Sequence, residues 1–388
     1  MQDGFINHTK LLLGFHEAER LPECFSGRSA VPDYAYSILN QEGLLYRPVV
    51  DERFIASSHR KPTWPEGKPF AVCLSHDVDS VTQHSVFQVL RKRSVMLRST
   101  GTMEEKLVSI FGGFSDLAKC LAGSGRNDPH HCMEKWLQVE EETGATSTFF
   151  FWPGFSALTV HHYSDCSYDL DDTIVFDAQR CSVAEMMQDI SRRGWEIGLH
   201  PSWHTFSNPD ELKRQKEALE KAVGHDIVSV RQHFLHYDIR ITPAVQSESG
   251  FLYDTTLGFN DNVGFRFGTC YPWHLYDQKN KRILPILEVP LIIQDGAMLL
   301  GHKGMRLDSG MAYRYVQQIT EEVMKVGGVL SLVWHPHYQA NADWWNLYLL
   351  TLEYIKQKNP WFATVRQVGE WFKKENSEIL CRYSKGFE

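Results

Sequence analysis

The chain lacks the features that would direct it to a membrane, to a nucleic acid or to an oxidising compartment. It contains no run of about 18 apolar residues, so we expect no transmembrane segment. Its 48 acidic residues outnumber its 40 basic ones, and the net charge of −8 makes nucleic acid an unexpected partner. The 8 cysteines form no Cys-x-x-Cys pair, which favours free thiols over a disulfide framework.

The N-terminal end shows no pattern typical of export. The apolar stretch 11–15 is followed at once by His16 and Glu17, so it is too short for the core of a signal peptide. Together with the scattered cysteines, this predicts a cytoplasmic protein. The oligomeric state stays open.

Apolar, β-rich runs alternate with helix-like stretches from about residue 68 onward. Strands are predicted at 70–75, 147–152, 195–199, 227–230, 283–293, 329–334 and 362–365, and helices at 133–142, 183–193, 210–223, 311–325 and 344–357. Strands that are apolar throughout and alternate with helices indicate a parallel sheet covered on both faces. The pattern predicts an α/β protein, a distorted (β/α) barrel of about seven parallel strands, with a doubly wound open sheet as the alternative.

Two regions interrupt this rhythm. Residues 1–66 are mixed in polarity and end in a stretch rich in turn formers, which predicts an N-terminal appended region. Residues 67–388 then form the barrel domain. A helical insertion is predicted at about 85–131, after the first strand.

Two carboxylates follow the first strand. Asp77 and Asp79 are two residues apart, so in a continuing strand they would face the same way and approach one ion. One of them would bind the metal and the other would remain as a general base. The alternative is that Asp79 caps a following helix.

Two histidines return after a later strand. His200 and His204 are spaced i, i+4, and Pro201 prevents a regular helix through the first of them, so we expect a loop that turns both rings toward one point. Imidazole and carboxylate together suit a hydrolytic metal site that keeps a position open for water. The alternative is that one ring caps a strand and the other is hydrogen-bonded in the core.

Five segments taken together resemble the motifs of the polysaccharide deacetylase family, the NodB-homology proteins of carbohydrate esterase family 4. In chain order they are Ser75-His76-Asp77-Val78-Asp79, His200-Pro201-Ser202-Trp203-His204, Arg231-Gln232-His233-Phe234, Gly264–Thr269 with Pro272-Trp273, and Val333-Trp334-His335. The resemblance covers about residues 68–372 and is nearest to a long-chain subset with a His-Asp-Val-Asp start. The first motif departs from the usual one, because Val78 separates the two aspartates.

The resemblance implies a role for each matching residue. A divalent metal, Zn²⁺ first with Co²⁺ or Ni²⁺ as alternatives, would be held by Asp79, His200 and His204. The catalytic set would be the base Asp77, the orienting Arg231, the Phe234 backbone N–H at the oxyanion and the acid His335. Substrate contacts would come from Trp203, Trp273 and Val333.

Several assignments stay open at this point. Asp77 and Asp79 could exchange roles, and His337 competes with His335 for the role of acid. Arg231 could instead form a structural ion pair with Asp238.

Three functions remain in competition. The first is a metal-dependent hydrolase that removes N-acetyl groups from an amino-sugar glycan or its precursor. The second is an amidohydrolase acting on a small cyclic amide or a formamide. The third is a catalytically inactive carbohydrate-binding protein, which would need no paired base and metal ligands.

Overall fold

The computed structural model describes residues 7–24, 34–82, 128–159, 162, 165–166, 168–300 and 304–381. The predicted insertion at about 85–131 therefore lies almost wholly outside the described residues. Among the residues described, no helix is long and apolar enough to cross a membrane.

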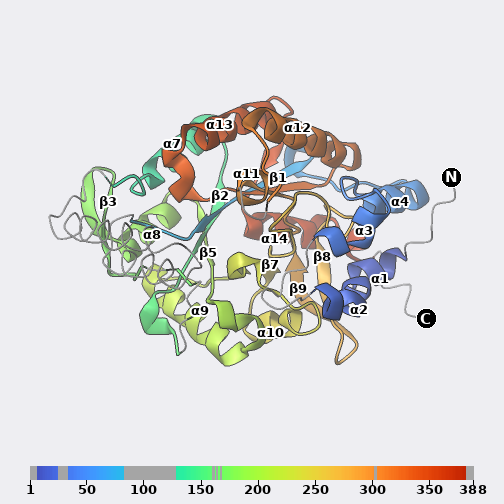
Figure 1. Cartoon of the computed structure of the whole chain (residues 1–388), viewed down its shortest axis with the longest axis horizontal. Coiled ribbons are helices and arrows are strands. Elements are labelled where there is room, and N and C mark those ends of the chain that lie inside the picture. The colour runs from blue at the N-terminus through green and yellow to red at the C-terminus, as the bar shows by residue number, and fades with distance from the viewer. Residues whose placement is uncertain are drawn as a thin grey trace, which may run out of the picture.

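A large, mostly parallel sheet forms the centre of the protein (Figure 1). Its strands lie in the order β10 (Ile293–Gln294), β11 (Val329–Val333), β1 (Ala71–Val78), β2 (Ser147–Phe151), β5 (Glu196–Leu199), β6 (Ser229–Val230), β7 (Tyr253–Asp254), β9 (Arg282–Glu288) and β8 (Trp273–Asp277). Neighbours from β10 to β9 are parallel, and β8 is antiparallel to β9. The α/β class is confirmed. Within the described ranges, β10 and β8 end the order and are not paired with each other.

Helices surround the strands in Figure 1, as expected for parallel strands that are buried on both faces. They are α7 (Met133–Thr143), α8 (Val183–Arg192), α9 (Pro209–Val223), α10 (Thr242–Glu248), α12 (Ser309–Val326) and α13 (Ala342–Lys356). Five of these six match predicted helices. Gly144, Gly224 and Gly327 follow α7, α9 and α12 with positive φ, which is typical of C-terminal caps of helices.

One predicted strand is divided in two. The apolar stretch 283–293 becomes β9 and the short β10, because the chain leaves the β7 edge of the sheet at Glu288 and returns beside β11 at Ile293. An antiparallel pair that was not predicted, β3 (Thr173–Phe176) with β4 (Gln179–Ser182), lies off the main sheet.

The two ends of the parallel strands are covered differently. β12 (Trp361–Phe362) pairs with the start of β1, and α14 (Val365–Glu375) follows it. The first backbone N–H groups of α14 donate to Thr148 and Glu196, which lie at the starts of β2 and β5. Because α14 occupies the amino ends of the strands, the carboxyl ends are left for a site. The remaining short helices are α11 (Asp295–Leu299) and α15 (Ser377–Leu380).

The N-terminal region packs into the same core as the sheet. It contains α1 (His8–Leu12), α2 (Phe15–Cys24), α3 (Ile38–Gln41) and α4 (Val49–Ser58). Leu11, Leu12 and Leu39 belong to the main hydrophobic cluster. The Asp51 carboxylate accepts hydrogen bonds from the Thr269 hydroxyl and the Cys270 backbone N–H. In the described part of residues 1–66, the region is thus joined to the rest of the α/β core through buried contacts.

Candidate metal centre and active site

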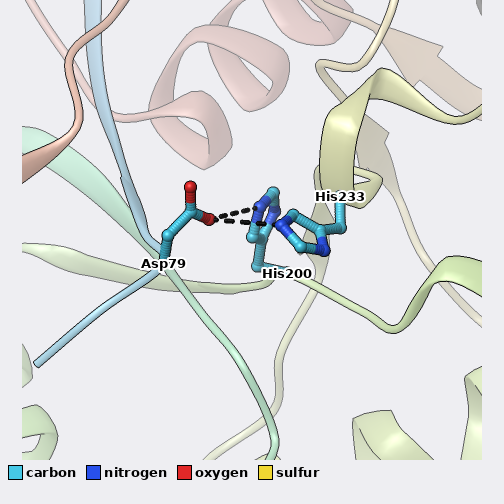
Figure 2. A group of neighbouring side chains, drawn as sticks. All are labelled: Asp79, His200 and His233. Atoms are coloured by element: carbon cyan, nitrogen blue, oxygen red, sulfur yellow. Dashed lines mark ion pairs between the residues drawn. The ribbon is translucent and has the colours of Figure 1, made fainter. Parts of the chain in front are cut away.

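Asp79, His200 and His233 converge at the carboxyl ends of the strands (Figure 2). One ligand atom from each lies within 4.8 Å of the other two. Asp79 Oδ1 is 3.3 Å from His200 Nε2 and 3.5 Å from His233 Nε2. Asp79 follows β1, His200 follows β5, and His233 begins the short turn after β6. Two imidazole nitrogens and a carboxylate oxygen are a donor set that fits a divalent metal.

The orientation of His200 is fixed by a backbone contact. Its Nδ1 lies 2.7 Å from the carbonyl oxygen of Arg231, which can only accept, so Nδ1 carries a proton. The Nε2 side of the ring therefore faces the Asp79 carboxylate. A ligand histidine that donates through its other nitrogen is typical of metal sites.

The histidines keep the Asp79 carboxylate ionised. Desolvation would raise its pKa, but the hydrogen bond with His200 and the charges of His233 and His335 place the pKa well below its usual value. Asp79 is thus an anion throughout the physiological range, as a metal ligand must be.

Asp77 lies beside this group and is held by Arg231. Arg231 Nη1 is 3.2 Å from Asp77 Oδ1, and the side chains are 0% and 6% exposed. Arg231 Nε donates to the Thr255 carbonyl, and its guanidinium lies 4.7 Å from the centre of the Phe150 ring. Asp238, the alternative partner of Arg231, is paired with Arg240 instead.

A glycine makes room for the Phe150 ring under Arg231. A Cβ at Gly198 would lie 2.5 Å from the Phe150 ring. Any larger residue at this position in β5 would push against the ring that supports the guanidinium.

His335 lies near the second carboxylate oxygen of Asp79 and is oriented by Asp295. His335 Nδ1 is 2.6 Å from Asp295 Oδ1, the backbone N–H of His335 donates to Asp295 Oδ2, and His335 Nε2 is 3.7 Å from Asp79 Oδ2. Burial would lower the pKa of His335, but Asp295 and then Asp79 and Asp77 raise it to about 10. His335 therefore holds the proton that a general acid needs.

His337 differs from His335 in its surroundings. Burial lowers the pKa of His337 to about 4. Its ring packs against Tyr338 at 4.1 Å, and the Asp295 carboxylate hydrogen-bonds His335 rather than His337. Of the two histidines considered as the acid, the contacts favour His335.

His204, the predicted third ligand, is not part of the convergent group, and His233 takes that place. His204 lies in the 3₁₀ helix Trp203–Ser207, where its ring packs edge-on against His162 with centroids 5.3 Å apart. The turn after Pro201 carries the second ring away from the first. The two histidines that meet Asp79 thus come from different strand ends.

Trp273 and Val333, which were predicted to contact the substrate, are both buried. Trp273 is 0% exposed, and its indole N–H donates to the Leu12 carbonyl of the N-terminal region. Val333 is also 0% exposed, but it lies at the end of β11 in a small apolar cluster with Leu235 and Leu291. Trp273 belongs to the main core, whereas the Val333 cluster is separate from it.

Trp203 and Phe234 lie near the group at the surface. Trp203 is stacked between His162 and His236, at 4.9 and 3.9 Å between ring centroids. Phe234 follows His233, is 50% exposed and has a φ of 56°. This left-handed backbone is uncommon outside glycine and is often found at functional sites.

Two residues of the site were missed in the sequence. His233 stood inside a segment already compared with a motif, but only Arg231 and Phe234 were given roles. Asp295 follows an apolar run that was predicted to be one strand, so its position at a strand end was hidden. The signal for both is the same: a polar side chain directly after a short strand.

Comparisons with known proteins support the fold. No protein-family model matches the chain, and no curated protein matches it. Among solved structures, a protein assigned as a polysaccharide deacetylase from Mycobacterium smegmatis superposes with a TM-score of 0.52 at 19% identity, over 82% of this chain and 94% of that one. The allantoinase Puue gives a TM-score of 0.52 at 13% identity, over 82% and 95%. A protein assigned as a polysaccharide deacetylase from Pseudomonas aeruginosa PAO1 gives 0.50 at 13% identity, over 83% and 97%.

These similarities define a class by fold. The chain has the α/β fold shared by polysaccharide deacetylases and an allantoinase, and it spans nearly the whole length of each.

Proposed function

We propose that this protein is a metal-dependent hydrolase that removes N-acetyl groups from an amino-sugar glycan or glycan precursor. The observation that carries the proposal is the convergence of an Asp–His–His donor set with a second, Arg-bound carboxylate and an Asp-bound histidine. Such a set supplies a metal site, a base and an acid within one group of side chains. The fold shared with proteins assigned as polysaccharide deacetylases supports it.

Asp79, His200 and His233 would hold the metal, with Zn²⁺ favoured by two imidazoles and one carboxylate. When bound, the metal supplies Lewis acidity that activates water and polarises the amide carbonyl. The predicted ligand His204 is replaced in this proposal by His233.

The chain's own residues would move the protons. Asp77, held by Arg231, takes a proton from the attacking water, because a carboxylate fixed by a guanidinium points its free oxygen in one direction. The Phe234 backbone N–H stabilises the oxyanion that forms on the substrate. His335, whose pKa is raised to about 10, donates a proton to the leaving amine.

The Val333 cluster offers a place for the methyl group of the acetyl substituent. Val333, Leu235 and Leu291 form an apolar group apart from the main core, and Leu235 directly follows Phe234. A small apolar surface next to an oxyanion donor suits an acetyl group. The ring of Trp203 and the exposed ring of Phe234 would border the sugar. Trp273, buried beneath the N-terminal region, has no part in this proposal.

A second candidate is hydrolysis of a small cyclic amide. The similarity to the allantoinase Puue, equal in TM-score to that of the Mycobacterium smegmatis protein, favours it. The chemistry is the same, since a metal, a base and an acid open a cyclic amide as they cleave an acetamide. The substrates differ in size, so they separate the two candidates.

The test begins with the metal. Chelator-stripped protein is titrated with Zn²⁺ in the wild type, in a His200→Ala/His233→Ala variant and in His204→Ala. We expect one-to-one binding that the double variant loses and His204→Ala keeps. Equal binding by the wild type and the double variant would remove the metal site from the proposal.

The loaded protein is then assayed for acetate release from N-acetylglucosamine oligomers and for ring opening of allantoin. Acetate release supports the deacetylase, and ring opening without acetate release supports the second candidate. Tight metal binding with neither reaction would contradict both substrate classes.

A further inference from the structure

His76 is the one histidine of the first motif, and it faces away from the metal group. It lies between Ser75 and Asp77 in β1, and neighbouring side chains of a strand point to opposite faces. His76 Nε2 lies 2.7 Å from Glu140 Oε1, and the side chains are 1% and 0% exposed. A buried ionisable pair therefore lies directly behind the strand end that carries Asp77 and Asp79.

The hydrogen bonds of this pair fix the position of the His76 ring. His76 Nδ1 is 3.0 Å from the carbonyl oxygen of Trp334, which can only accept, so Nδ1 carries a proton. Nε2 is hydrogen-bonded to Glu140. Glu140 in turn accepts from the Ser147 hydroxyl, the Trp195 indole N–H and the Tyr348 hydroxyl.

Aromatic rings enclose the imidazole of His76. The Phe149 ring is stacked on it at 4.6 Å, and the Trp136 ring meets it edge-on at 4.8 Å. These ring contacts hold the imidazole in one orientation.

The pair joins two of the strand ends that form the site. His76 is next to the base Asp77, and its acceptor Trp334 is next to the acid His335. We propose that the His76–Glu140 pair is a positioning device: Glu140 holds the His76 ring, whose Nδ1–H fixes the Trp334 carbonyl and thereby sets His335 against Asp77 and Asp79. This inference rests on the proposed function for its catalytic consequence, while the contacts that define the pair do not.

Two substitutions test the hydrogen bonds of the two His76 ring nitrogens separately. The amide nitrogen of Asn stands near the position of Nδ1, so His76→Asn keeps a donor for Trp334 and loses Glu140. The longer Gln places its amide near Nε2, so His76→Gln keeps the bond to Glu140 and loses the one to Trp334. Both remove the same ring from the core, which makes each the packing control for the other.

With acetate release as the assay, we expect His76→Gln to lower kcat by roughly ten- to hundredfold at unchanged KM, because misplacing an acid that acts only during reaction costs rate rather than binding. His76→Asn should recover most of that loss. Equal kcat in the two variants, whatever their stability, would overturn the positioning role.

A second measurement does not need activity. The ¹⁵N resonances of labelled histidine should show His76 Nδ1 protonated, and Glu140→Gln should shift the Nε2 resonance. The ring resonances of His335 should shift in His76→Gln and stay near the wild-type positions in His76→Asn. If the wild type releases no acetate, the proposed function fails, while these resonances still decide the inference. An unprotonated His76 Nδ1 in the wild type, or identical His335 shifts in the two variants, would refute it.

Discussion

Two pairs of carboxyl groups lie at the carboxyl ends of the parallel strands, and they differ in ionisation: one pair has a positive partner for each carboxylate, while the other retains a proton. Asp77 and Asp79 close β1, while Asp254 of β7 and Glu288 of β9 lie opposite each other in register. The pKa of Asp79 is held well below its usual value. Burial raises the pKa of Asp254 to about 6, and that of Glu288 rises well above its usual value.

The neighbours of each pair explain the difference. Asp77 and Asp79 face an arginine and three histidines, so each negative charge has a positive partner. Asp254 and Glu288 are both 0% exposed and are hydrogen-bonded to each other, with the Thr256 hydroxyl and the Leu257 backbone N–H as further donors. Two adjacent buried carboxyl groups cannot both ionise readily, so the pair retains a proton. Position at a strand end thus permits chemistry, and the neighbours decide which chemistry follows.

The two pairs are also connected along the chain. Thr255, directly after Asp254, accepts from Arg231 through its carbonyl and its hydroxyl, and Arg231 holds Asp77. The pair that retains a proton therefore supports the loop that anchors the fully ionised pair. Replacing single carboxyl groups should separate a catalytic role from a supporting role.

The largest effect is expected at Asp77. Asp77→Asn keeps the shape of the side chain and removes the base, so kcat should fall by roughly 10³-fold or more, near the range for loss of a general base. Acetate release from the zinc-loaded enzyme measures this.

Zinc affinity provides the control for Asp77→Asn. It should change little, because Asp79 rather than Asp77 belongs to the ligand group. If the variant keeps its activity and loses zinc instead, the two aspartates have exchanged roles.

The next effect is expected at Asp295, the partner of His335. Asp295→Asn should lower kcat by roughly 10²-fold. It should also move the alkaline limb of the kcat/KM profile to lower pH, because Asp295 is the chief charge that raises the pKa of His335 to about 10. A pH profile of unchanged shape would show that His335 is not the acid.

Asp295→Asn should also lower the free energy of unfolding, because it breaks the Asp295–His335 pair. The pKa of His335 is raised in the folded protein, so the stabilisation it provides is fully present below about pH 6.5, the value in the unfolded chain, and is lost as the pH rises through about 10. In chelator-stripped protein, Asp295→Asn should cost about 3 kcal/mol near pH 7. The difference from the wild type should shrink toward pH 10, as measured by denaturant unfolding.

Much of the fold could be predicted from the sequence, because long apolar strands and capped helices carry local signals. β1 and β2 read as continuous apolar runs, and Gly224 marks the end of α9. The two-residue strands β6 and β7 carry too little pattern to be placed by periodicity. The packing of Leu11 and Leu12 into the main core depends on contacts distant in sequence. For this reason the sequence predicted residues 1–66 to be an appended region.

The site divides in a similar way. Asp77, Asp79 and His200 follow long strands and were predicted at the site. His204 was chosen by spacing, but a spacing of four residues fixes a direction only in a regular helix, and the chain here turns through a 3₁₀ helix. His233 reaches Asp79 through β6, whose neighbour in the sheet is β5, and this pairing is tertiary information.

The smallest effect on activity is expected at Asp254, and it should appear mainly in stability. An acid whose pKa is raised by folding binds more protons in the folded than in the unfolded chain, so the free energy of unfolding falls as the pH rises from about 4 through about 6. Asp254→Asn removes this cost and keeps a side chain of the same shape. Relative to the wild type, the variant should gain up to about 3 kcal/mol between these pH values.

Denaturant unfolding at a series of pH values tests the difference between the two pairs, with Glu288→Gln as the matched variant on the facing strand. Either amide alone leaves one carboxyl group and a neutral partner, which is close to the proton-sharing state of the wild type, so Thr255 should keep its hold on Arg231 and kcat should change less than about threefold. A loss of kcat as large as that in Asp295→Asn, at unchanged zinc affinity, would mean that the Asp254–Glu288 pair takes part in the reaction itself. In that case, the separation between a fully ionised catalytic pair and a proton-sharing supporting pair would fail.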